Sequence, residues 1–223
     1  DGRDAHLTGR RVLVRACMRP FGFGSLENVW MASDFDGAIA EFVKVPASEV
    51  FPVDCGWSDA ELATIPCAYG TAENMLHRAG LASGERVLVT GASGGVGSAA
   101  IQLARRRGAR IIAVTSPDKI DAVKDLGCEI VLERGKNVLG ALGECSIDLL
   151  VDNVAGPQFA DMPKLLRRGG RGAGAAPAAG VGRGGRGAGA GRGGATGGLA
   201  ATGGGSGAVL GARARSSARR RAV

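Results

Sequence analysis

The stretch Arg86-Val-Leu-Val-Thr-Gly-Ala-Ser-Gly-Gly-Val-Gly-Ser-Ala-Ala-Ile-Gln-Leu-Ala104 decides the fold of this 223-residue chain. Its first part, Arg86–Thr90, is a short apolar run typical of a buried strand. A glycine-rich turn follows, and a helical pattern then extends over Val96–Arg107. The stretch therefore predicts a strand, a tight turn and a helix in immediate succession.

The spacing of the glycines in this turn is typical of a dinucleotide-binding site. Gly91 permits the tight turn, and Gly94 and Gly95 allow the backbone to approach a pyrophosphate. Gly97 allows the helix to pack close to the strand. The helix N-terminus then offers free N–H groups and a positive dipole end to the phosphates. A nucleoside-triphosphate P-loop is excluded because no Gly-Lys-Ser/Thr follows the glycines.

Strands and helices alternate on the C-terminal side of the turn. The predicted strands are Arg110–Thr115, Ile130–Leu132 and Ile147–Val151, and the predicted helices are Asp118–Leu126 and a segment from Gln158 to Gly169-Gly170. Short apolar strands interleaved with helices indicate a parallel sheet covered on both faces. We therefore expect an α/β fold with a Rossmann-type dinucleotide-binding domain over residues 63–171.

Residues 1–62 have a different, β-rich pattern. Strands are predicted at Arg11–Arg15 and Ala38–Val45, and Ser58 with Glu61 forms the sequence pattern of a helix-capping box. The chain starts at Asp1 and a strand-like run follows almost at once, so we expect that residues precede it in the natural protein.

Residues 172–223 form a low-complexity tail of glycine, alanine and arginine. From Arg171 onward the chain carries nine arginines and no Asp, Glu or Lys, which leaves 19 basic and 21 acidic side chains in residues 1–170. The tail lacks aromatic residues and any hydrophobic period, so we expect it to be disordered. Its dominant residues, Gly, Ala, Arg and Pro, have codon families that begin with two G or C bases, as a GC-rich gene read out of frame would produce. We therefore expect that the tail is a frameshift product. The alternative is an RNA-binding arm, which we disfavour because base-stacking aromatics are absent.

The tail has a consequence for the predicted sheet. Because no strand-like run follows Gly169-Gly170, the strand Ile147–Val151 is expected to form an uncovered apolar edge, and such edges favour aggregation. We expect little or no turnover from the chain as written.

The cysteines and the hydropathy pattern indicate the cellular compartment. The five cysteines form no C-x-x-C pair, which favours free thiols in a reducing cytosol over a disulfide framework or a zinc knuckle. No apolar run reaches the roughly 20 residues of a membrane helix, and no signal peptide opens the sequence. We expect a cytoplasmic protein without a membrane partner.

The end of the second predicted strand indicates the cofactor. NAD enzymes usually carry an Asp or Glu there that binds the ribose 2′-hydroxyl. Here the sequence reads Thr115-Ser116-Pro117-Asp118-Lys119, and hydroxyl groups near a lysine suit a 2′-phosphate better. We therefore favour NADP(H) over NAD(H). In the alternative interpretation Asp118 takes the role of the acid and Lys119 is a solvated helix residue.

Several segments, in order, resemble the medium-chain dehydrogenase/reductase superfamily, especially its quinone-oxidoreductase-like and zinc-type alcohol-dehydrogenase-like members. They are Gly9-Arg-Arg-Val-Leu-Val14, Asp36-Gly-Ala-Ile-Ala-Glu-Phe-Val-Lys-Val-Pro46, Ala63-Thr-Ile-Pro-Cys-Ala-Tyr-Gly-Thr-Ala-Glu-Asn-Met-Leu76, Gly84-Glu-Arg-Val-Leu-Val-Thr-Gly91, Leu126-Gly127 and Val151-Asp-Asn-Val154. Short-chain dehydrogenases share the glycine pattern, but their downstream Tyr-x-x-x-Lys is absent because the single tyrosine, Tyr69, lies upstream.

The resemblance implies hydride transfer between NAD(P)H and a quinone, enone, aldehyde or alcohol, with a small-molecule substrate between a GroES-like catalytic lobe and the Rossmann domain. By position, Thr71 would lie near the nicotinamide, and Asn153-Val154 would border the nicotinamide side of the site. The pyrophosphate and the adenosine ribose would be held by Ser93, Gly94, Gly95, Val96, Ser116 and Lys119. The resemblance also admits a homodimer.

Zinc is a separate question. In the zinc-type branch a cysteine four residues before the matching threonine is a catalytic ligand, and Cys67 has that spacing from Thr71. The close group of four structural-zinc cysteines is absent, because only Cys17 occupies that region. We therefore interpret Cys67 as a buried thiol and expect direct hydride transfer without zinc.

No catalytic residue is identified. The alternatives are a zinc-dependent alcohol dehydrogenase and a non-catalytic dinucleotide-binding fragment with an RNA-binding arm.

Overall fold

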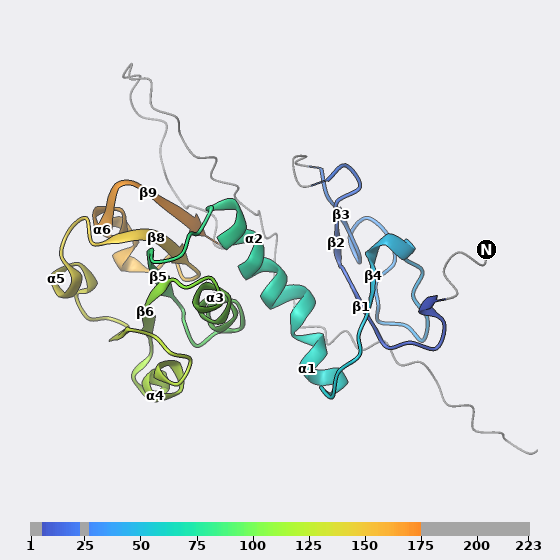
Figure 1. Ribbon diagram of the computed structural model, residues 1–223. Coiled ribbons are helices and arrows are strands. Elements are labelled where there is room, and N and C mark those ends of the chain that lie inside the picture. Colours follow the sequence, from blue (N-terminus) through green and yellow to red (C-terminus); the bar gives the residue numbers. More distant parts are fainter. Residues whose placement is uncertain (1–5, 23–26, 175–223) are drawn as a thin grey trace, which may run out of the picture. The chain divides into compact units, whose positions relative to one another are not determined.

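The computed structural model describes residues 6–22 and 27–174, which belong to two compact units (Figure 1). The first unit ends at Cys67 and the second begins at Ala68. The predictions for the tail beyond residue 174, including disorder, a frameshift product and an RNA-binding arm, concern residues outside this description.

The first unit contains two small antiparallel sheets. Strand β1 (Val12–Val14) pairs with β4 (Val50–Pro52), and β2 (Cys17–Met18) pairs with β3 (Val29–Trp30). The predicted capping box is confirmed at the start of α1 (Asp59–Ala63). There the Ser58 N–H donates to Glu61 Oε2 at 2.7 Å, and the Glu61 N–H donates back to Ser58 Oγ at 3.3 Å.

The strand predicted at Ala38–Val45 is wrong. This segment consists of bends and irregular backbone, with Ile39 94% and Phe42 82% exposed. The alternating pattern is typical of a strand, but a strand also requires a partner for its backbone groups. None of the strands in residues 6–22 and 27–67 pairs with this segment.

The second unit is a five-stranded parallel sheet with helices on both faces, as predicted (Figure 1). The spatial order is β7-β6-β5-β8-β9. The strands are β5 (Arg86–Thr90), β6 (Arg110–Thr115), β7 (Ile130–Glu133), β8 (Ile147–Asp152) and β9 (Leu166–Gly174). The helices are α2 (Gly70–Arg78), α3 (Gly95–Arg106), α4 (Ile120–Lys124), α5 (Val138–Leu142) and α6 (Met162–Leu165). A π-helix (Ile65–Tyr69) precedes α2, and the 3₁₀ helices Pro117–Lys119 and Pro157–Ala160 precede α4 and α6; a further 3₁₀ helix, Ala47–Glu49, lies in the first unit.

The core of this unit lies on the two faces of the sheet because side chains alternate along each strand. Val87 and Val89 of β5 belong to one apolar cluster, which α2, α3 and α4 cover. Leu88 belongs to the other cluster, which includes Val138 of α5 and Leu165 of α6. Both faces of the sheet are therefore buried. A binding site can form at the edge where the carboxyl ends of the parallel strands meet.

The predicted helix up to Gly169-Gly170 and the predicted open edge at Ile147–Val151 are both wrong. Helix α6 ends at Leu165, and β9 pairs in parallel with β8, so residues 172–174 of the predicted tail lie in a strand. Glycine is a poor strand former and arginine adds no apolar pattern, but the strand ladder is made by backbone groups that any residue other than proline supplies. Arg171 pairs with Glu85 and Arg167 with Asp148, which ties β9 to its neighbour β8 and to the residue that precedes β5.

Candidate dinucleotide-binding site

The glycine turn brings helix α3 into close contact with the end of β5. Gly91 has a φ of +59°, a left-handed conformation that favours glycine. A methyl group at Gly97 would lie 2.9 Å from Ala92 Cα and closer still to the carbonyl oxygen of Gly91. Only glycine fits at position 97 without a backbone shift, so this residue acts as the sequence predicts for a tight strand-to-helix turn.

The N-terminus of α3 is open toward the outside of the unit. Gly94 is its N-cap, and no side chain caps the first turn. The N–H groups of the first turn have no partner within the helix, so they are available to an anion. Ser93, Gly94 and Gly95 are exposed and Val96 is half-buried. The four residues predicted to hold a pyrophosphate therefore surround this helix end.

A buried carboxylate, which the sequence analysis did not identify, organises the turn after β8. Asp152 is 5% exposed and accepts hydrogen bonds from the Thr90 hydroxyl, from the Val154 N–H at 3.3 Å and from the Ala155 N–H at 3.0 Å. The available signal was a charged residue directly after an apolar strand. Asp152 links the last residue of β5 to the segment predicted to border the nicotinamide.

Asn153 fixes the same turn against the glycine turn. Its N–H donates to Thr90 Oγ1 and its Nδ2 donates to the Thr90 carbonyl oxygen, both at 3.0 Å. A methyl group at Gly91 would lie 3.0 Å from Val154 Cγ2. The predicted residues Asn153 and Val154 are thus brought beside the glycine turn. The Asn153 Oδ1 is buried and has no partner among the described residues.

The predicted adenosine-end residues follow β6. Ser116 is half-buried, and Lys119 is exposed with its Nζ 3.8 Å from Asp118 Oδ2. A hydrogen bond from the Ser116 side chain, followed by the charges of Lys119 and Arg134, lowers the pKa of Asp118 below its ordinary value. Thr115, at the end of β6, is 2% exposed, and its hydroxyl has no partner among the described residues.

The remaining predicted residues lie on the helix that opens the second unit or just before it. Thr71 is the second residue of α2 and is half-buried, and a methyl group at Gly95 would lie 3.5 Å from Ala68 Cβ. Cys67 is exposed, so the interpretation of this residue as a buried thiol is wrong. It is the last residue of the first unit and therefore lies outside the core of either unit. Within residues 6–22 and 27–174, no three His, Cys, Asp or Glu side chains are grouped to hold a metal ion.

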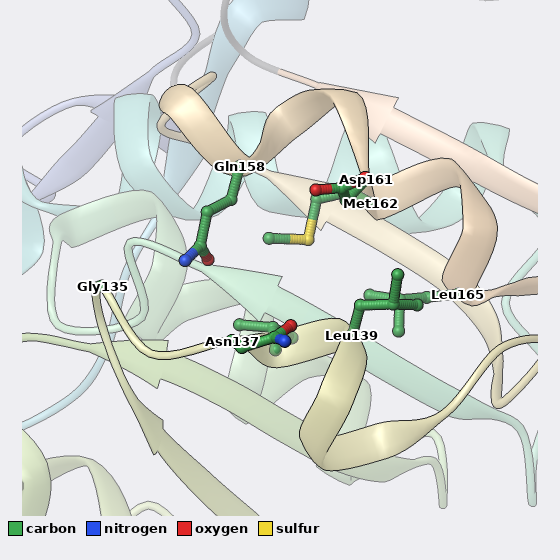
Figure 2. A pocket seen from close by; sticks show the side chains of 8 residues that line it. Gly135, Asn137, Leu139, Gln158, Asp161, Met162 and Leu165 are labelled. Atoms are coloured by element: carbon green, nitrogen blue, oxygen red, sulfur yellow. The ribbon is translucent and has the colours of Figure 1, made fainter.

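A separate pocket of about 240 Å³ lies between α5 and α6 (Figure 2). Figure 2 shows Gln158 and Met162 on one side and Asn137, Leu139 and Leu165 on the other. None of its lining residues belongs to the predicted cofactor set. We therefore assign this pocket no part in cofactor binding.

Two general features bear on the predicted compartment. All five cysteines, Cys17, Cys55, Cys67, Cys128 and Cys145, are free thiols. In the part of the chain that the structure describes, no helix is long and apolar enough to cross a membrane.

Comparison with known proteins agrees with this geometry. The family model of zinc-binding dehydrogenases matches residues 95–179. A putative alcohol dehydrogenase from Sinorhizobium meliloti 1021 superposes with a TM-score of 0.71 at 45% identity, covering 81% of this chain and 52% of the other. The quinone oxidoreductase from Thermus thermophilus, also solved in complex with NADPH, has a TM-score of 0.56 at 36% identity over 64% of this chain and 48% of its own. The proteins that this chain matches are members of the medium-chain dehydrogenase/reductase superfamily.

Among curated medium-chain relatives, an acryloyl-coenzyme A reductase from Metallosphaera sedula is 36% identical over 140 residues, which is 63% of this chain and 42% of the relative. A 2-methylene-furan-3-one reductase from Solanum lycopersicum is 33% identical over 136 residues, 60% of this chain and 34% of the relative. The chain thus spans less than half the length of these medium-chain relatives, both of which are oxidoreductases by name. The predicted resemblance to this superfamily is confirmed.

Proposed function

We propose that this medium-chain protein binds NADPH at the glycine turn and serves hydride transfer to a small molecule with a conjugated, polarised double bond, such as an enone or a quinone. The observation that carries the proposal is the close contact at Gly97, because it aims the uncapped N-terminus of α3 at the carboxyl edge of the sheet. The names of the relatives support this substrate class, since acryloyl-coenzyme A and 2-methylene-furan-3-one both contain conjugated double bonds.

The residues of the site would act mainly by binding and orientation. The free N–H groups at Gly95 and Val96 would hold the pyrophosphate, and the turn at Asn153-Val154 would limit the position of the nicotinamide ring. Thr71 would contact the opposite side of that ring. The bound cofactor supplies a hydride from C4 of the nicotinamide. The Asp152 hydrogen bonds would keep the ring-bordering turn rigid during transfer.

The described residues do not fit a zinc ion, because Cys67 belongs to no group of three potential ligands in residues 6–22 and 27–174. We derive no step through zinc, and we identify no proton donor. The five free thiols support a reducing compartment such as the cytoplasm.

Titration of the purified chain with NADPH and NADH, followed by nucleotide fluorescence, tests the proposal. We expect tighter binding of NADPH. Gly95→Ala should weaken both nucleotides by about tenfold, because a methyl group would occupy space needed by a phosphate. Arg106→Ala, at the exposed far end of the same helix, is the matched control. If the wild-type chain binds neither nucleotide, the proposed function is wrong.

A further inference from the structure

Arg134 lies beside the residues predicted to hold the adenosine ribose, although its own sequence context does not indicate this. Strands β6 and β7 are parallel, with Thr115 in register with Glu133 at their carboxyl ends. The Arg134 N–H then donates to the Thr115 carbonyl oxygen at 2.6 Å. Because this bond ties Arg134 to the last residue of β6, its side chain leaves the sheet at the same edge as Ser116.

The charges around this edge give Arg134 a particular role. Lys119 is paired with Asp118, so one positive charge is offset by one negative charge. Lys136 lies 4.0 Å from Glu133 and is offset in the same way. Arg134 is exposed, and no carboxylate of the described residues lies within 4 Å of its guanidinium group. It therefore leaves this edge with a net positive charge.

We propose that Arg134 is the residue by which this site selects NADPH over NADH, its guanidinium group pairing with the 2′-phosphate. The planar group presents two parallel N–H donors that match a phosphate, whereas an ammonium group is a point charge. Asp118 already lies 3.8 Å from the Nζ of Lys119, and this ion pair leaves its carboxylate less free to bind a ribose 2′-hydroxyl. The inference rests on the proposed function, since it assumes that a dinucleotide occupies the glycine turn.

The test compares full-length Arg134→Ala with Lys136→Ala, a cation two residues further along the same loop that is already paired. The ligands are NADPH and NADH, and the fragments 2′,5′-ADP and 5′-AMP, which differ by the 2′-phosphate alone. In Arg134→Ala we expect the Kd of NADPH and of 2′,5′-ADP to rise about tenfold, the size of a partly solvated charged contact. The Kd of NADH and of 5′-AMP should stay within about twofold.

Arg134→Lys should keep part of the preference, and raising the salt concentration should reduce the wild-type preference because the pair is exposed. Lys136→Ala should behave as the wild type. Equal weakening of NADPH and NADH in Arg134→Ala, or no change in either, overturns the role of Arg134 while the proposed function stands. A wild-type chain that binds neither nucleotide overturns both.

Discussion

At the scale of single residues, two glycines of the same turn have different surroundings and should tolerate substitution differently. A Cβ atom at position 97 would lie within 2.9 Å of backbone atoms of Gly91 and Ala92. A Cβ atom at position 95 would have Ala68 Cβ as its nearest neighbour, at 3.5 Å. Backbone atoms cannot yield as a flexible side chain can. We expect Gly97→Ala to lower the free energy of unfolding by about 3 kcal/mol, measured by urea denaturation with far-UV circular dichroism.

Gly95→Ala is the matched control for that measurement. A methyl group at this position meets ordinary van der Waals space, and alanine is the better helix former, so stability should be unchanged or rise by up to about 1 kcal/mol. The two variants thus separate packing from ligand binding: one loses stability, and the other loses affinity for the nucleotide. Equal destabilisation by both substitutions would contradict the assigned roles.

At the scale of elements, strand β9 depends on ion pairs at the opposite end of the sheet from the glycine turn. Glu85 is mostly buried and accepts from the Ala82 N–H at 2.9 Å and from Arg171. Burial alone would raise the pKa of Glu85, but these two hydrogen bonds outweigh it and hold the pKa below its ordinary 4.5. Ionised Glu85 is therefore favoured by folding, and protonation removes that contribution.

The sign of the pH dependence follows from this lowered pKa. The contribution of Glu85 is fully present above about pH 4.5 and is lost as the pH falls through its lower folded-state pKa. Urea denaturation of the wild type should therefore show stability falling below pH 4.5, and Glu85→Gln should reduce the slope. Asp121→Asn, at a side chain that is 94% exposed, should leave the slope as in the wild type. An identical slope in Glu85→Gln would remove Glu85 as the group responsible.

The elements also show which information the sequence carries. Strands β5 to β8 were predictable because their apolar residues must be buried on both faces, and the pattern records this. Strand β9 was missed because its glycines and arginines carry no apolar pattern, while its backbone bonds to β8 do not depend on side chains. The reverse error occurred at Ala38–Val45, where the pattern is present and no strand of the described residues pairs with it.

The candidate site also contains features that the sequence pattern predicts and features that only the folded sheet reveals. The glycine turn was predictable because only glycine satisfies its geometry, so the requirement is local and visible. Asp152 and Arg134 act through contacts with Thr90 and Thr115, which are distant in sequence and adjacent only in the folded sheet. A basic residue after the neighbouring strand is a common surface feature. The position of Arg134 beside Thr115 follows only from the register of β6 and β7, which the sequence does not show.

At the scale of the whole molecule, the two units differ in how much apolar surface they bury. The described part of the first unit buries only Met18, Met31 and Leu62 as apolar core residues, and the remaining buried apolar residues belong to the second unit. The first unit also holds most of the large exposed apolar side chains: Phe21, Trp30, Ile39, Phe42, Phe51 and Trp57. Because burial of apolar surface is the main favourable term in folding, the first unit should be the less stable one.

The two tryptophans give a direct measurement of this difference, since Trp30 and Trp57 both lie in the first unit. We expect tryptophan fluorescence to change at a urea concentration about 1 M lower than the far-UV circular dichroism signal, which comes mainly from helices α2 to α6. Saturating NADPH should raise the midpoint of the second transition only, because a ligand stabilises the unit that binds it. Trp57→Phe leaves Trp30 as the reporter and should give the same early transition. Coincident transitions that shift together with NADPH would instead mean that the units unfold as one cooperative structure.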